Sequence, residues 1–182
     1  MALLLNEIVF ERDPALRQLV SVQAFKAWSD YQCKHSQPKL TGSNVKLRLL
    51  ASNADNNDIP MPEPKHLLAL RWLQRHEQAL HDHIIAAIFG LAPSFKAHWR
   101  ELEITHLLPP LNCAQDLKQL IDLSYIDIYT QTKDDLPYLG FEFECDWDPE
   151  HGFHVLTHGL LVVTLDGDVN DIAVIARDGG HS

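Results

Sequence analysis

The sequence predicts an α+β fold: an antiparallel β-meander in the C-terminal half packed against a long amphipathic helix, with an N-terminal β-ribbon beside them. One stretch repeats apolar side chains at helical spacing, whereas several later stretches and the N-terminal quarter alternate apolar with polar side chains. A length of 182 residues suits one compact domain with its own core. We divide the chain into the ribbon part (1–52), a loop (53–62), and the helix with the antiparallel sheet (63–182).

The ribbon part begins with "MALLLNEIVFERD". We interpret this stretch as a first strand, because no basic residue precedes the apolar run and Glu7 interrupts it, which is unlike an export signal. "LVSVQAFKAWSDYQ" fits both strand and helix spacing, and we favour a strand because loop residues follow it. In "VKLRLL", apolar residues alternate with basic ones, which predicts a further strand. The segment "ASNADNNDIPMPEP" is rich in Asn, Asp and Pro and predicts a flexible connection.

The long helix begins at Glu63, where apolar residues start to recur at steps of three and four. This apolar stripe consists of Leu67, Leu70, Leu73, Leu80, Ile84, Ile88 and Leu91, with Glu77 interrupting it. Pro64 suits the first helical turn, and "GLAP" supplies a stop. His76, Glu77 and His81 resemble a metalloprotease motif, but the two histidines are five residues apart instead of four and therefore diverge around the helix. We interpret them as part of a solvated polar face.

After the long helix, "SFKAHWREL" is predicted to form a second short helix, and one more helix precedes the meander. This last helix begins near Ala114 and ends before Ser124. The strands are expected in segments that alternate apolar and polar residues or are richly apolar: "YIDIYTQT", "PYLGFEFECDW", "GFHVLTH", "LLVVTLDGD" and "DIAVIARD". The second of these places apolar side chains on one face and acidic side chains on the other.

Charge and cysteine content restrict the class of protein. The formal net charge is −10, and the stretch from Asp134 to Asp178 holds eleven acidic residues against one base, Arg177. Repulsion from phosphates argues against nucleic-acid binding, and no apolar run approaches the ~18 residues of a membrane helix. An odd number of cysteines without a CxxC pair favours a reducing compartment. We therefore expect a cytoplasmic protein.

The segment Cys145 to Gly159, "CDWDPEHGFHVLTHG", concentrates acidic and histidine side chains. Asp148, Pro149 and Gly152 have the residue types of a turn between two strands. The alternative is a metal site, for which the candidate ligands are Asp148, Glu150, His151, His154 and His158. Zinc requires three or four ligands that converge tetrahedrally, and the spacing matches no known finger or ribbon pattern. We favour a turn with surface histidines.

Other motifs give no positive support for catalysis. No GxSxG, P-loop or GxGxxG occurs. Cys145 has the parity of the apolar face, and an inward cysteine is usually inert. "DGDVND" resembles the start of a calcium loop, but Asp171 occupies the position that requires glycine, so we interpret the segment as a hairpin turn.

The segment "YLGFEFECDWDPEHGFHVLTHG" resembles a family of uncharacterised bacterial domains that carry a pattern like GFEFxCxWDxEHGxGVxxH. The matches lie at Gly140 to Phe143, Cys145, Trp147, Asp148, Glu150, His151, Gly152, Val155 and His158. "LKQLIDLSYIDIY" and the first half of the chain are also similar to that family. His154 departs from the pattern, which has glycine there. The resemblance implies a place in bacterial toxin and immunity neighbourhoods, where a small acidic protein blocks a toxin.

We therefore expect a non-enzymatic immunity-type protein without a cofactor, whose partner is a basic, nuclease-like bacterial toxin. Its acidic surface would mimic the phosphates that a nuclease binds. The expected contact residues are Glu142, Glu144, Asp146, Trp147, Asp148, Glu150 and His151. The alternatives are a metal-dependent hydrolase or metal-binding protein built on the Asp148 and His151 cluster, and a small-ligand module between helix and sheet. The sequence leaves the oligomeric state open.

Overall fold

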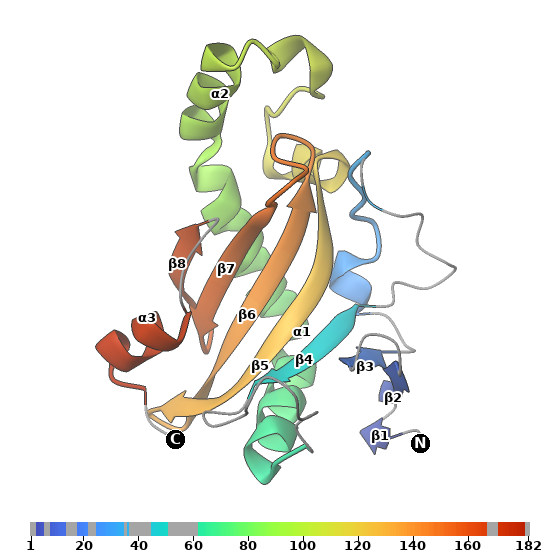
Figure 1. The fold of residues 1–182 in the computed structure, drawn as a ribbon, viewed down its shortest axis with the longest axis vertical. Coiled ribbons are helices and arrows are strands. Elements are labelled where there is room, and N and C mark those ends of the chain that lie inside the picture. The colour runs from blue at the N-terminus through green and yellow to red at the C-terminus, as the bar shows by residue number, and fades with distance from the viewer. Residues whose placement is uncertain are drawn as a thin grey trace.

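A mixed β-sheet with helices on both faces forms the body of the protein (Figure 1). The computed structural model describes residues 3–5, 8–13, 18–21, 25–34, 36, 45–50, 62–166 and 171–180. The strands in these ranges are β1 (Leu3–Leu5), β2 (Ile8–Asp13), β3 (Gln18–Ser21), β4 (Lys46–Leu50), β5 (Ile121–Lys133), β6 (Leu136–Cys145), β7 (Phe153–His158) and β8 (Leu161–Asp166). The predicted α+β class is confirmed.

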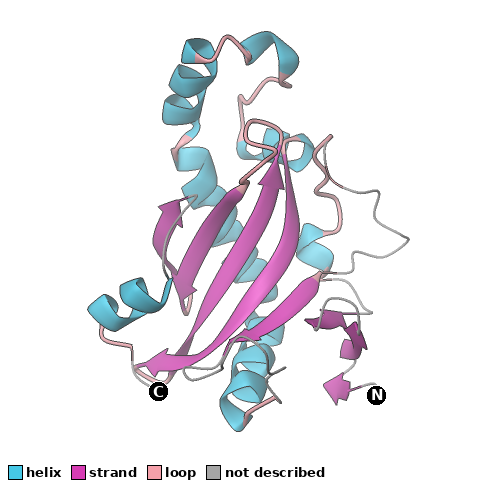
Figure 2. Ribbon diagram, in the orientation of Figure 1, coloured by secondary structure: helices cyan, strands magenta, loops and turns pink. Residues whose placement is uncertain are grey.

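The helices differ in length and in their place around the sheet (Figure 2). The α-helices are α1 (Pro64–Gly90), α2 (Ala92–Glu101) and α3 (Asp171–Asp178), and the 3-10 helices are η1 (Lys26–Trp28), η2 (Thr105–Leu107) and η3 (Ala114–Gln119). In the described ranges, no helix combines the length and the apolar character needed to cross a lipid bilayer.

The strands lie side by side in chain order, from β1 to β8. Every neighbouring pair is antiparallel except β4 and β5, which run parallel with Lys46 opposite Tyr125 and Leu50 opposite Tyr129. A parallel pair needs a crossover connection, and the segment that contains α1 and α2 provides it. The predicted N-terminal ribbon and C-terminal meander therefore belong to one sheet.

The two faces of the sheet have different cores. Ile126, Ile128 and Phe141 are fully buried in the main core, which also holds the apolar stripe of α1. Tyr129 and Tyr138 point to the other face, where they form a smaller cluster with Leu156 and Ile175 of α3. Since side chains alternate along a strand, α1 and α3 cover opposite faces. Helix α3 covers only part of its face, and polar side chains occupy the neighbouring area.

Helix α1 confirms the prediction for this segment. It starts at Pro64, and Glu63 donates its backbone N–H to His66 Nδ1 at 3.0 Å. The interruption at Glu77 has a structural cause, because Glu77 Oε1 accepts the N–H of Ala27 at 2.9 Å. Similarly, His81 Nε2 lies 2.9 Å from the hydroxyl oxygen of Tyr31. The expectation of a solvated polar face was therefore wrong for Glu77 and His81, which fasten the 25–34 segment to α1.

Several other expectations need correction. Residues 26–28 form η1 instead of a strand, because burial of Phe25, Trp28 and Tyr31 follows the helix-like spacing. The N-terminal stretch holds two paired strands, β1 and β2, where one was expected.

The end of the chain also differs. The segment "DIAVIARD" forms α3 instead of a strand, and it buries Asp171 and Ile175, four residues apart. The helix from Ala114 ends at Gln119, because β5 already begins at Ile121. The expected loop at 53–62 lies outside the described residues, apart from residue 62, and so does most of the expected turn after β8.

Candidate functional site

The seven expected contact residues do not form one surface. Glu144, Glu150 and His151 are exposed, whereas Glu142 is half-buried and pairs with Arg48. Asp146 is buried: its Oδ1 accepts the N–H of Lys34 at 2.7 Å, and its own N–H donates to the carbonyl of Leu120 at 2.9 Å. In this structure the carboxylate of Asp146 therefore fastens the 25–34 segment to the end of β6.

Trp147 also faces the protein. Its ring lies 4.9 Å from Phe95, 5.7 Å from Trp99 and 5.6 Å from Phe153, measured between ring centroids. Phe95 and Trp99 belong to α2, so the indole joins this helix to the strand ends. Aromatic pairs at such distances add to the energy of burial. Trp147 therefore anchors the chain that follows it.

The expected turn from Asp148 to Gly152 is confirmed. Asp148 Oδ1 accepts the N–H of His151 at 3.1 Å, and the N–H of Gly152 donates to the carbonyl of Asp148 at 2.9 Å. Gly152 has φ +65°, and a Cβ atom there would lie 2.2 Å from the carbonyl oxygen of Phe143. Only glycine fits this position without rearrangement. The turn thus has a defined shape and carries Glu150 and His151 on its outside.

The metal site expected as the alternative is not assembled. His151 Nδ1 lies 3.1 Å from Asp148 Oδ1 in a local pair, and His158 Nε2 lies 2.7 Å from the carbonyl oxygen of Lys133, at the far end of β7. His154 and His158 do share a face of the sheet, as expected. In the described ranges, the one group of three or more metal-ligating side chains with converging atoms is Asp127, His154 and Asp171.

Cys145 has no features of a nucleophile. Its side chain is fully buried on the apolar face, as the strand parity predicts. Burial raises the pKa of its thiol to about 12, so the thiol remains protonated near neutral pH. The structure therefore gives no support to catalysis by this cysteine.

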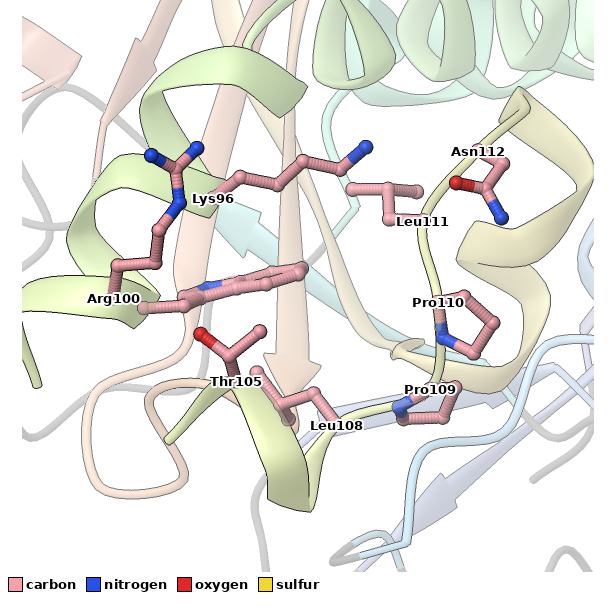
Figure 3. Close-up of a pocket in the computed structure, with 9 residues that line it drawn as sticks. Lys96, Arg100, Thr105, Leu108, Pro109, Pro110, Leu111 and Asn112 are labelled. Atoms are coloured by element: carbon pink, nitrogen blue, oxygen red, sulfur yellow. The ribbon is translucent and has the colours of Figure 1, made fainter. Parts of the chain in front are cut away.

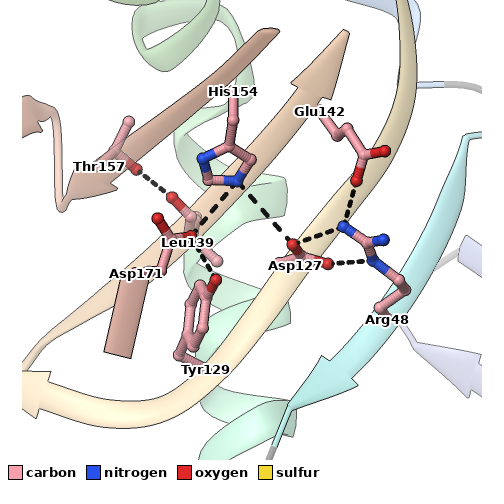
Figure 4. A network of polar contacts seen from close by, with 8 residues as sticks. All are labelled: Arg48, Asp127, Tyr129, Leu139, Glu142, His154, Thr157 and Asp171. Carbon is pink, nitrogen blue, oxygen red and sulfur yellow. Dashed lines mark hydrogen bonds and ion pairs between the residues drawn. The ribbon is translucent and has the colours of Figure 1, made fainter. Parts of the chain in front are cut away.

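A polar network lies on the face that α3 only partly covers (Figure 4). At its centre Arg48 of β4 binds Asp127 of β5 through two hydrogen bonds, from Nε to Oδ1 at 2.5 Å and from a terminal nitrogen to Oδ2 at 2.8 Å. The same terminal nitrogen also donates to Glu142 of β6. Burial acts to lower the pKa of Arg48, but Asp127 and Glu142 outweigh it and raise that pKa, which keeps the guanidinium charged. These contacts connect three neighbouring strands.

His154 of β7 extends the network toward α3. Its Nε2 atom lies 3.3 Å from Asp171 Oδ2 and 3.9 Å from Asp127 Oδ2. Tyr129 donates its hydroxyl hydrogen to Asp171 Oδ2. Burial raises the pKa of Tyr129, and the charges of Asp127 and Asp171 raise it further. The phenol therefore stays protonated and remains a donor.

Gly140 makes room for the imidazole of His154. A Cβ atom at position 140 would lie 2.6 Å from His154 Nε2 and 3.0 Å from both His154 Cε1 and Asp127 Cβ. Because position 140 bears no side chain, the imidazole can lie across strand β6 toward Asp127 of β5.

Arg48, Asp127 and Asp171 were not predicted as site residues from the sequence. Arg48 and Asp127 are 79 residues apart in the chain, so no local motif joins them. The available signals were weak: polar residues at the outward positions of strands, and glycine inside the strand at position 140.

A pocket of about 300 Å³ lies beside α2 (Figure 3), and none of its lining residues belongs to the polar network. It is lined by Lys96, Trp99, Arg100, Thr105, Leu108, Pro109, Pro110, Leu111 and Asn112. Trp99 is only 3% exposed, and its Nε1 atom has no hydrogen-bond partner among the described residues. The pocket thus lies between α2 and the 105–112 segment, and not between the long helix and the sheet, where a small-ligand module was expected.

Comparison with known proteins places the chain in one family. Residues 20–172 match the model of a family described as Domain of unknown function (DUF6985). No curated protein and no solved structure matches the chain. The matched segment covers most of the chain and includes the turn from Asp148 to Gly152 and every residue of the polar network. The chain therefore belongs to the DUF6985 family.

Proposed function

We propose that this chain is a non-enzymatic immunity-type protein that binds and inhibits a bacterial antibacterial toxin. The contact surface would be the acidic turn, which we define as Asp148 to Gly152, together with Glu144 beside it. Four of the seven residues expected from the sequence remain in this surface: Glu144, Asp148, Glu150 and His151. Asp146 and Trp147 would support it from the inside, since both are engaged in interior contacts.

One observation carries the proposal: interior contacts fix the conformation of the turn, while its charged side chains are exposed. Asp148 and Gly152 close the turn, and Trp147 anchors its start against α2. The His151 side chain is 73% exposed, and Glu144 and Glu150 are exposed without an ion pair in the described part of the chain. A surface whose shape is already fixed loses less conformational entropy on binding.

The charge of the protein favours a basic partner. With a formal net charge of −10, the chain attracts a cationic surface over long range and raises the association rate. The carboxylates of Glu144, Asp148 and Glu150 would occupy positions that phosphates take in the active site of a nuclease-like toxin. Such attraction weakens as salt increases, which gives the proposal a measurable signature.

The experiment uses the purified chain and the purified product of the adjacent gene, tested as the toxin. Association rates are measured at low and high salt, and inhibition of the toxin is measured in parallel. Replacing Glu144 and Glu150 together by lysine should lower the association rate by about tenfold or more. Glu101→Lys is the matched control: its side chain is 77% exposed at the end of α2, outside the proposed surface, so it should change the rate far less.

Two results would count against the proposal. A tight complex with rates indifferent to salt and to the double reversal would exclude the acidic turn as the contact surface. Absence of both binding and inhibition with the product of the adjacent gene, by a chain whose folding is verified by circular dichroism, would exclude the immunity role for that pair.

A further inference from the structure

Three potential metal ligands from three separate elements meet on the partly covered face of the sheet. They are Asp127 of β5, His154 of β7 and Asp171, the first residue of α3. One ligand atom from each lies within 4.8 Å of the other two. Figure 4 shows the imidazole of His154 directed between the two carboxylates. This convergence requires the whole sheet and α3, so it is a product of the tertiary fold.

Two buried polar atoms at this site form no hydrogen bond in the described part of the chain. Asp171 is only 8% exposed, and its Oδ1 atom is buried with no hydrogen bond within the ranges described. His154 Nε2 is likewise buried and forms no hydrogen bond there, although both carboxylates lie near it. Buried polar atoms are normally satisfied, so each exception calls for an explanation such as an ion that completes the site.

The charges at this point are unbalanced. The described residues of the polar network include three carboxylates, from Asp127, Glu142 and Asp171, and one guanidinium, from Arg48, which pairs with the first two. With a neutral imidazole, the group therefore carries two more negative than positive charges. Asp127 and Asp171 are both buried, where uncompensated charge is costly. A bound cation would balance the group.

The surrounding residues already fix the orientation of the three ligands. Arg48 holds both oxygens of Asp127, and Tyr129 donates a hydrogen bond to Asp171. Gly140 leaves the space that the imidazole occupies. Outer contacts of this kind orient the ligands of metal sites and contribute to their affinity.

We propose that Asp127, His154 and Asp171 bind one divalent transition-metal ion, with zinc as the best fit. Zinc accepts imidazole nitrogen and carboxylate oxygen at about 2.0–2.2 Å, so neighbouring ligands around it lie about 3.4 Å apart. His154 Nε2 lies at similar distances from the carboxylate oxygens, 3.3 Å from Asp171 Oδ2 and 3.9 Å from Asp127 Oδ2. The imidazole favours zinc over calcium and magnesium, which prefer oxygen ligands. Three protein ligands leave at least one position for water or a partner's side chain.

The test is isothermal titration of the full-length chain, freed of any histidine tag and treated with a chelator, with zinc chloride and then manganese chloride. The expected result is one site per chain, whose affinity for zinc falls by more than about tenfold in His154→Gln. Loss of a residue that only orients a metal ligand already lowers metal affinity by about tenfold, so loss of a ligand should cost more. Asp171→Asn should have a similar effect. His151→Gln is the matched control, because His151 lies beside a carboxylate in the exposed turn and should leave this site unchanged.

Melting temperatures separate loss of a ligand from loss of the fold. The His154→Gln variant without metal should unfold cooperatively, but zinc should raise its melting temperature much less than that of the wild type. If Asp171→Asn fails to fold, the histidine variant decides alone. A wild-type chain that binds no zinc or manganese at millimolar concentration, or a His154→Gln variant that binds as tightly as the wild type, overturns the proposal. The result is independent of toxin binding.

Discussion

Replacing Gly140 by alanine should destabilise the protein through a specific collision. The new Cβ atom would lie 2.6 Å from His154 Nε2, closer than carbon and nitrogen approach without bonding. Asp127 Cβ and His154 Cε1, both at 3.0 Å, would be crowded as well. Since Gly140 has no positive φ, its backbone conformation itself accepts alanine. The expected penalty therefore comes from displacing the imidazole.

The magnitude follows from two opposing effects. Overpacking a buried position costs about 1–3 kcal/mol, whereas replacing glycine in a strand recovers about 0.5–1 kcal/mol of backbone entropy. We expect Gly140→Ala to lower the free energy of unfolding by about 1–2 kcal/mol. Gly90→Ala is the control, because a Cβ atom at the end of α1 would have no neighbour within 4 Å and should be neutral or slightly stabilising.

Urea denaturation of a double-mutant cycle tests the cause of this penalty. If the imidazole is what the new methyl group meets, Gly140→Ala should cost clearly less in a His154→Ala background. Some cost should remain there, because Asp127 Cβ is still at 3.0 Å. An equal cost in both backgrounds would refute the argument, since the penalty would then arise elsewhere.

Three further predictions concern other parts of the molecule. Trp147→Ala should lower the free energy of unfolding by about 2–3 kcal/mol in urea denaturation, because the half-buried indole loses its aromatic contacts; a loss below about 1 kcal/mol would contradict this. Burial raises the pKa of Glu77, so the folded state holds the proton of this carboxyl more tightly than the unfolded state does. The folded protein therefore loses stability relative to the unfolded state as pH rises above the ordinary carboxyl range. Glu77→Gln should accordingly gain stability relative to the wild type between about pH 4 and pH 7, and an unchanged difference would disprove it. Ellman's reagent should label the exposed Cys113 rapidly in the native protein and reach the buried Cys33 and Cys145 only after unfolding, whereas immediate labelling of all three would show that the core is open.

Sequence patterns predicted the elements whose periodicity is long and regular. The apolar stripe of α1 extends over many turns, and the alternation in β5 and β6 matches the faces that the structure shows. Short segments were less certain. In "DIAVIARD", Ile172 and Val174 alternate as in a strand, while Asp171 and Ile175 are also spaced as on one helix face, and the contact with Tyr129 and Tyr138 decides for the helix.

The polar network could not be read from local patterns. Arg48, Asp127, Glu142 and His154 occupy ordinary polar positions of strands, and Asp171 begins a short helix. The site exists only because β4 lies parallel to β5 and α3 folds back onto the sheet. Such pairing depends on contacts between distant residues, which a single sequence does not list. In contrast, the turn at Asp148 to Gly152 was predicted correctly, because turn chemistry is local.

The parallel pairing of β4 with β5 also determines when the N-terminal third of the chain can fold during synthesis. Lys46 meets Tyr125, and Arg48 meets its partner Asp127 79 residues later. At about 5–20 residues per second, a ribosome needs about 4 to 16 s to make that stretch. Until then, β4, which carries the buried side chains of Leu47 and Leu49, can pair only with β3. The edge of β4 that later pairs with β5 thus stays unpaired for seconds in the nascent chain, which makes it a binding site for chaperones during synthesis.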